Sequence, residues 1–131
     1  YAPSGSLLND VCAVEDSEIL FLDMKKILSH KKCSCGICDI IKKNLICEIS
    51  GKNRSLVAKL GYISKRTIRE KLTAYLSDEA KKHSSSCFEI PYNRQQLADF
   101  LSVDRSAMSR ELGKMRCEGL LDFEKNRFTL K

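Results

Sequence analysis

The chain has 131 residues, seven cysteines, no tryptophan and a formal net charge of +6. This length suffices for one compact domain or two small ones, and the longest apolar runs are too short to span a membrane. The N-terminus lacks the regions of a signal peptide, and the odd cysteine count argues against a disulfide scaffold, so we expect a cytoplasmic protein. The chain also begins without Met, which indicates a fragment of a longer protein.

The charge is unevenly distributed along the chain. The first 24 residues contain five acidic residues and no Lys or Arg, whereas the segment from residue 84 onward contains eight basic and seven acidic residues. The basic excess therefore lies between Lys25 and Lys82. Bulk charge gives only loose support for a polyanionic partner, so DNA binding has to be judged from where individual side chains point.

The N-terminal segment 11–22, VCAVEDSEILFL, contains two short apolar runs around a turn-like Glu-Asp-Ser. Such runs tolerate extended backbone, and the segment predicts two short strands.

Three cysteines follow within six residues: Cys33, Cys35 and Cys38. Closely spaced thiolates can ligate zinc or an iron–sulfur cluster, but Cys47 would lie roughly 13 Å along a helix from Cys38, too far to join them without a bend. We expect ordinary cysteines and no metal or other cofactor here. The alternative, a redox or metal sensor module built on these three thiols, stays open. The other cysteines are expected to be packing residues; they are Cys12, Cys87 and Cys117.

A long helix is predicted from about residue 38 to residue 60. Its apolar residues form a narrow seam flanked by Lys and Glu, comprising Ile41, Leu45, Ile49, Leu56 and Leu60. The seam fits a dimerisation helix, or a single amphipathic helix packed on its own domain. A second helix is predicted with Ser64 as N-cap and an i, i+4 stripe of Ile68, Leu72, Leu76 and Ala80. A polar linker over 83–86 and an edge strand over 88–91, ended by Pro91, follow it.

The segment 93–130 predicts two helices joined by a tight turn and followed by a hairpin. Leu97 and Leu101 lie on one face of the first helix, and Asp104 is a suitable N-cap for the second. The apolar stripe of the second helix is Met108, Leu112 and Met115. Arg110 lies about 200° round that helix from Met108, at about 100° per residue, and Gly119 ends the helix. This order of elements is that of a winged helix-turn-helix.

The amino-acid sequence of this segment resembles that of the Crp/Fnr transcription regulators. The matching stretches are NRQQLADFL at 93–101, VDRSAMSREL at 103–112 and EGLL at 118–121. The resemblance implies a mostly α fold with a small β part: a C-terminal winged helix-turn-helix, a long dimerisation helix and a remnant of a β jelly-roll sensor domain. It divides the chain into residues 1–32, the incomplete end of the effector-sensing jelly roll; 33–62, the dimerisation helix; and 63–131, the DNA-binding domain.

The resemblance also implies a sequence-specific regulator that binds double-stranded DNA as a homodimer on an inverted repeat and has RNA polymerase as a partner. Arg110 would read guanine through its N7 and O6 atoms. Ser106 stands where many relatives have Glu, which puts the target sequence in doubt. The other expected DNA contacts come from the outward face of the second helix, from the start of the first helix and from the wing turn: Arg105, Ser109, Lys114, Asn93, Arg94, Lys125 and Arg127.

The remaining expectations concern other functions. No GxSxG, P-loop or HExxH pattern occurs, so we expect no enzyme, and Asp99 and Glu111 are interpreted as solvent-facing. Leu7 and Leu8 align with the Arg-Ser pair that holds the phosphate in cyclic-nucleotide-binding relatives, so we expect no cyclic nucleotide. A protein-interaction module that uses the winged helix without DNA is a further alternative.

Overall fold

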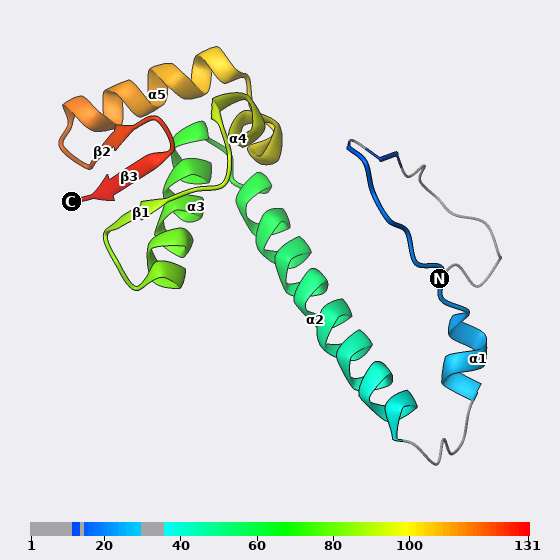
Figure 1. The fold of residues 1–131 in the computed structure, drawn as a ribbon. Coiled ribbons are helices and arrows are strands. Elements are labelled where there is room, and N and C mark those ends of the chain that lie inside the picture. The colour runs from blue at the N-terminus through cyan, green and yellow to red at the C-terminus, as the bar shows by residue number, and fades with distance from the viewer. Residues whose placement is uncertain (1–11, 14, 30–35) are drawn as a thin grey trace. The chain divides into compact units, whose positions relative to one another are not determined.

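The computed structural model describes residues 12–13, 15–29 and 36–131 (Figure 1). In chain order the elements are α1 (Met24–Ser29), α2 (Ile37–Ile63), α3 (Ile68–His83), β1 (Cys87–Glu89), α4 (Arg94–Leu101), α5 (Arg105–Cys117), β2 (Leu121–Glu124) and β3 (Arg127–Leu130). The chain divides into two compact units, residues 1–51 and 52–131. Helix and a small antiparallel sheet make up this structure, as the sequence predicted.

The two strands predicted within residues 11–22 do not form in the described part of that segment. Residues 12–13 and 15–23 have no strand hydrogen bonds, and Leu20 and Phe21 are 81% and 89% exposed. A strand needs a neighbour to pair its backbone N–H and C=O groups, and no described segment pairs with this one. The prediction of strands from the apolar runs is therefore wrong for these residues.

The long helix predicted from residue 38 to residue 60 is confirmed as α2, and Ser64 turns out to belong to its end. The Ser64 hydroxyl donates to the carbonyl of Gly61, so Ser64 is not the N-cap of the next helix. Thr67 is that N-cap: its hydroxyl accepts from the Glu70 amide, and the Glu70 carboxylate accepts from the Thr67 amide. This reciprocal capping box starts α3 three residues later than predicted.

The end of α2 is joined to α3 through a tyrosine pair. The rings of Tyr62 and Tyr75 meet edge to face at 5.6 Å between centroids, and the Tyr62 hydroxyl donates to Asp78 Oδ2 at 3.0 Å. Burial, together with that hydrogen bond, raises the pKa of Tyr62 to about 12. Tyr62 is the buried side chain of α2 in the described residues, so this contact fixes the last turn of α2 to α3 within the C-terminal unit.

The sheet has the strand order β1-β3-β2, and both pairings are antiparallel. Phe88, Phe128 and Phe123 occupy one row across it. Because β1 pairs on one side only, the prediction of an edge strand before Pro91 is confirmed. Lys125, with φ +52°, forms part of the turn between β2 and β3, the wing of the domain.

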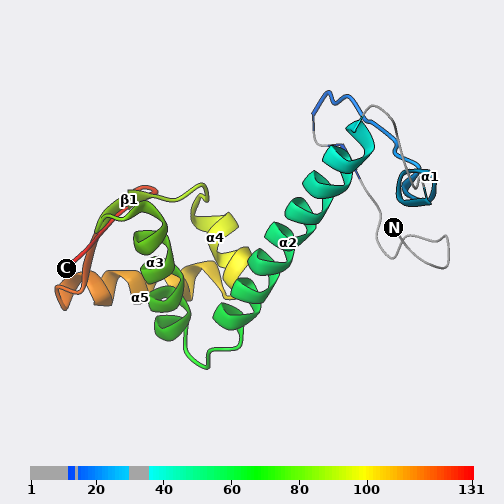
Figure 2. The ribbon, with the colours of Figure 1, turned by 90° about the horizontal axis from the view of Figure 1, so that it is seen from below.

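One hydrophobic core lies between α3, α4, α5 and the sheet. Its fully buried members include Leu72 and Leu76 of α3, Leu97 and Leu101 of α4, and Phe128 of β3. Figure 2 shows α3, α4 and α5 grouped together in the C-terminal part of the chain, with β1 beside α3. The stripes predicted from i, i+4 spacing are thus the stripes that form the core.

Two further expectations concern cysteines and membranes. Cys12 and Cys117 are exposed and Cys87 is half-buried, so these thiols are not the packing residues predicted. Cys33 and Cys35 lie outside the described residues. Among the residues that the structure describes, no group of side chains could hold a metal ion. No helix of the described segments combines the length and hydrophobicity that a membrane span requires.

Candidate DNA-binding surface

The turn between α4 and α5 is built from two helix ends that meet within three residues. Ser102 takes a left-handed conformation, with φ +52°, and its amide donates back to the carbonyl of Asp99. Asp104 then begins α5 as its N-cap, because its Oδ1 accepts from the Ala107 amide at 2.7 Å. The predicted N-cap is confirmed, and the sharp turn presents the first turn of α5 outward.

α5 has one buried and one exposed face, as predicted. Met108, Leu112 and Met115 are at most 3% exposed. The polar residues of the first two turns point to solvent, namely Arg105, Ser106, Ser109 and Arg110. Arg105 and Arg110 make no ion pair or hydrogen bond with the described residues, so both guanidinium groups keep their donors available.

Lys114 is also exposed, and its ammonium lies 4.0 Å from Glu111. Glu111 is not the solvent-facing residue that was predicted. Its side chain is only 19% exposed and pairs with Arg69 of α3. The i, i+4 pattern could not reveal this pair because its partners are 42 residues apart. Asp99 is exposed, as predicted, and accepts a hydrogen bond from Gln95.

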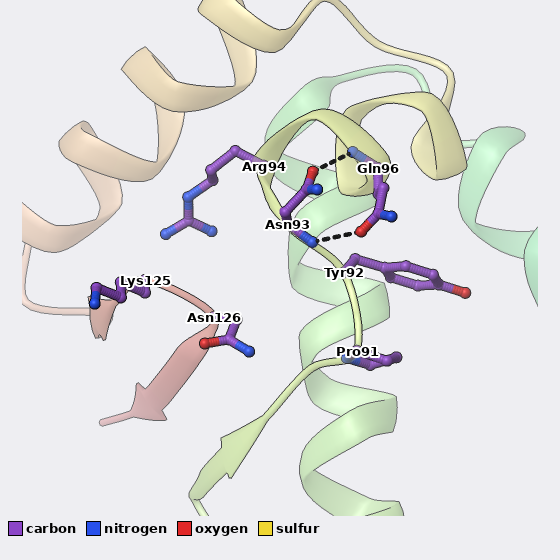
Figure 3. A pocket seen from close by; sticks show the side chains of 7 residues that line it. All are labelled: Pro91, Tyr92, Asn93, Arg94, Gln96, Lys125 and Asn126. Atoms are coloured by element: carbon purple, nitrogen blue, oxygen red, sulfur yellow. Dashed lines mark hydrogen bonds between the residues drawn. The ribbon is translucent and has the colours of Figure 1, made fainter.

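The start of α4 is closed by a second capping box. Asn93 Oδ1 accepts from the Gln96 amide and Gln96 Oε1 accepts from the Asn93 amide, both at 2.9 Å (Figure 3). Asn93 was expected at a phosphate. Its side-chain oxygen fixes the first turn of the helix, and the phosphate contact stays a prediction.

A cleft of about 450 Å³ lies between the start of α4 and the wing turn. Figure 3 shows the Arg94 guanidinium extending toward Lys125 and Asn126. It lies 4.7 Å from the ring centroid of Phe123 and 4.9 Å from that of Phe128. Burial in this position lowers the pKa of Arg94, yet an arginine stays charged at neutral pH. The stacking fixes the direction of a cation that the sequence placed only on the helix surface.

Arg127 stands on β3, beside the wing turn. It is exposed, and its Nε–H donates to the Sγ of Cys87 at 3.3 Å. This hydrogen bond raises the pKa of Arg127 and lowers the pKa of the Cys87 thiol. Asn126 Nδ2 donates to Glu89 Oε1 at 2.7 Å and so ties the wing turn to β1.

Two contacts that hold α5 in place could not be predicted from the sequence pattern. Arg116, near the end of α5, pairs with Asp122 of β2 at 2.8 Å and stacks on Phe123. Arg69, on α3, pairs with Glu111 and Glu118. Nothing in the sequence near Arg69 or Arg116 indicates these partners.

Comparison with known proteins agrees with this geometry. Residues 70–131 match the family model described as the Crp-like helix-turn-helix domain. The chain is similar to the solved structure of FixK2 from Bradyrhizobium japonicum, with a TM-score of 0.62 and 17% sequence identity over 82% of this chain and 53% of that one. The chain thus spans about half the length of that protein, and the likeness shows a shared fold. No curated protein matches the chain.

The expectation of a Crp-type domain is therefore confirmed for the C-terminal part of the chain. The model match covers α4, α5 and the wing, and so includes the cleft and the exposed face of α5. The individual DNA contacts stay predictions. Leu7 and Leu8 lie outside the described residues.

Proposed function

Because residues 70–131 are a Crp-like helix-turn-helix domain, we propose that this chain belongs to a sequence-specific DNA-binding transcription regulator that acts as a homodimer. The single observation that carries the proposal is the exposed face of α5. A helix whose apolar stripe is buried and whose outer face carries unpaired arginines and serines is suited to the major groove.

Within the proposed interface Arg110 is the principal base reader. Its guanidinium is exposed and unpaired among the described residues, so it can present two parallel N–H donors to guanine N7 and O6. Arg105, Ser106 and Ser109 lie on the same exposed face and reach neighbouring bases or phosphates. Ser106 offers a short hydroxyl, which discriminates less between bases than a carboxylate that accepts from a cytosine amino group.

The phosphates on either side of the groove are contacted by cations held on the framework. Arg94 is fixed over two phenylalanine rings and lines the cleft, and Lys125 and Arg127 come from the wing. Lys114 lies two turns along α5 from Ser106 and adds a further positive charge. Such contacts set register and affinity and carry no sequence information of their own.

The proposed homodimer rests on α2. Leu56, Val57 and Leu60 of α2 are 60–61% exposed although their side chains are apolar. Ile49, Asn53, Leu56 and Leu60 follow the alternating four- and three-residue spacing of a coiled-coil seam, in which a polar residue at one position sets the register. A parallel pair formed through this seam would present two α5 helices to successive major grooves, about 34 Å apart, and would favour an inverted repeat.

The protein acts on transcription with RNA polymerase as a partner, and not as an enzyme. It works in the cytoplasm, where the DNA is. It binds no cyclic nucleotide, because the leucines at positions 7 and 8 cannot neutralise a cyclic phosphate.

The proposal is tested by selecting duplexes from a random-sequence library with the purified chain. The expected result is enrichment of an inverted repeat with half-sites about one helical turn apart, and binding that weakens steeply as salt rises. A chain that enriches no sequence and shows no salt-dependent binding to duplex would contradict the proposed function. A protein-interaction module would give that result.

A further inference from the structure

The guanidinium group of Arg69, on α3, lies against α5. Arg69 Nε donates to Glu111 Oε1 at 2.5 Å, and Nη1 and Nη2 donate to the two oxygens of Glu118 at 2.7 and 2.8 Å. One planar group is thus shared by two carboxylates, that of Glu111 in α5 and that of Glu118, the C-cap residue of the same helix. The residues of this Arg69 clamp are Arg69, Glu111 and Glu118.

The geometry of the clamp constrains α5 in two ways. Glu111 and Glu118 are seven residues apart, so they lie two turns apart on nearly the same side of the helix. Holding one of them restricts how far α5 can slide along its axis. Holding both from one rigid fork also restricts how far α5 can rotate, because a guanidinium presents its donors in a fixed plane.

The apolar contacts of α5 do not supply this precision alone. Two of the three buried side chains of α5, Met108 and Met115, are methionines. Methionine is flexible and fits irregular space, so it stabilises a packed helix without fixing its rotation. The polar clamp, together with the Arg116–Asp122 pair near the end of the helix, distinguishes one rotation of α5 from its neighbours.

The clamp acts next to the proposed base reader. Arg110 precedes Glu111 in the chain, and the two side chains leave the helix about 100° apart. A rotation that broke the Arg69–Glu111 pair would therefore turn Arg110 away from its position on the outer face. Glu111 is the more buried of the two carboxylates, with 19% of its side chain exposed against 46% for Glu118, and it is the one beside Arg110.

Helix α3 also contacts the end of α4. Lys71 Nζ donates to the carbonyls of Leu101 and Ser102 at 3.1 and 3.4 Å, at the end of α4. These are two of the carbonyl groups that a helix leaves unpaired at its C-terminus. α3 thus contacts both helices of the helix-turn-helix through cationic side chains. Arg69 contacts α5 and Lys71, two residues later, contacts the end of α4.

We propose that Arg69 is a positioning residue for DNA recognition: it sets the rotation of α5 and thereby the direction of Arg110. This inference rests on the proposed function. Arg69 contacts no DNA itself, so its loss lowers the affinity for the cognate site and leaves the affinity for random duplex nearly unchanged. A residue that only contributed charge would affect both duplexes equally.

The experiment compares a duplex selected by the wild-type chain with a random duplex of the same length, at one salt concentration. For Arg69→Gln we expect the ratio of cognate to random affinity to fall about tenfold, the discrimination that one bidentate base contact carries. Arg69→Lys keeps the charge but lacks the fork, so it should not restore the ratio. Arg66→Gln is the matched control: it removes one positive charge from an exposed arginine of the α2–α3 turn and should leave the ratio unchanged.

Glu118→Gln separates positioning from charge by the sign of its effect. The substitution removes a negative charge from the DNA-binding domain, so an electrostatic effect alone would strengthen binding to both duplexes. The clamp predicts weaker binding to the cognate duplex together with equal or stronger binding to the random one. Amide hydrogen exchange on α5 should be faster in Arg69→Gln than in Arg66→Gln, at a temperature where circular dichroism shows both variants folded.

The outcomes are distinguishable. A wild-type chain that binds duplex and an Arg69→Gln variant with an unchanged ratio would overturn the positioning role alone. So would a Glu118→Gln variant that binds both duplexes more tightly. A wild-type chain without salt-dependent duplex binding would instead overturn the proposed function, and the role of Arg69 in recognition with it.

Discussion

The last three turns of α2 and the whole of α5 carry apolar stripes of similar composition, yet their surroundings differ completely. Leu56 and Leu60 of α2 are 61% and 60% exposed, whereas Leu112 of α5 is 1% exposed. The stripe of α5 is covered by the chain's own core, whereas the described residues leave more than half of each α2 leucine exposed. The difference shows that hydrophobic periodicity identifies a helix with an apolar face but does not identify the surface against which that face packs.

The largest expected effect is on the α2 stripe. Replacing Leu56 and Leu60 together by Glu should abolish the homodimer, because burying each leucine contributes about 1.5–3 kcal/mol and two buried charges would oppose association further. Sedimentation velocity at micromolar concentration measures the change.

Asn44→Glu is the control for charge, since it alters an exposed polar position of the same helix. If the double variant sediments as the wild type does, the apolar stripe of α2 is not the dimer contact.

The second prediction concerns the covered stripe. Leu112→Ala should lower the free energy of unfolding by about 2–5 kcal/mol, because it leaves a cavity in a close-packed core. Leu56→Ala, measured at a concentration where the chain is monomeric, should change it by less than about 0.5 kcal/mol. Urea denaturation followed by circular dichroism gives both values, and equal losses would refute the contrast between the two helices.

The third prediction tests the outer face of α5. Arg110→Ala should lose about 1–3 kcal/mol of binding free energy to the selected duplex and almost none to a random duplex. Fluorescence anisotropy with labelled duplexes provides the measurement. Equal losses on the two duplexes would mean that Arg110 contacts only phosphate.

The smallest expected effect is on the capping box of α3. Hydrogen bonds from the backbone amide of Thr67 and its neighbours lower the pKa of Glu70 below its ordinary value of 4.5. A carboxyl group with a lower pKa in the folded state stabilises the fold above its unfolded pKa, and this stabilisation is lost as the pH falls through the folded value.

Glu70→Gln should therefore flatten the pH dependence of unfolding between about pH 5 and pH 3, because the amide keeps its acceptor oxygen and does not titrate. Thermal melts across that range measure the slope. The rest of the acid-induced loss should remain in the variant, since the pKa of Glu118 is also lowered, by its hydrogen bonds with Arg69. An unchanged slope would show that the Glu70 cap does not contribute.

Sequence alone determined the helices of the C-terminal unit and their buried faces. The spacing of Met108, Leu112 and Met115 sufficed, because a helical period of 3.6 residues places them on one side whatever they pack against. Asp104 as N-cap and Gly119 at the end of α5 were equally local, since each is fixed by hydrogen bonds or backbone torsions within a few residues. The amino-acid sequence of residues 93–121 was sufficient to identify the type of domain.

Only the tertiary structure decided which polar residues are free and which are held. Arg69, Arg94 and Arg110 are alike in sequence, yet one joins two carboxylates, one lies over aromatic rings and one remains unpaired. Their partners come from segments up to 49 residues away, and no local pattern encodes a contact across that separation. In the described part of the N-terminal segment, residues 12–13 and 15–22, the expected strands are absent for the same physical reason: extended backbone is stable only beside a partner strand, and the fold decides which strands become neighbours.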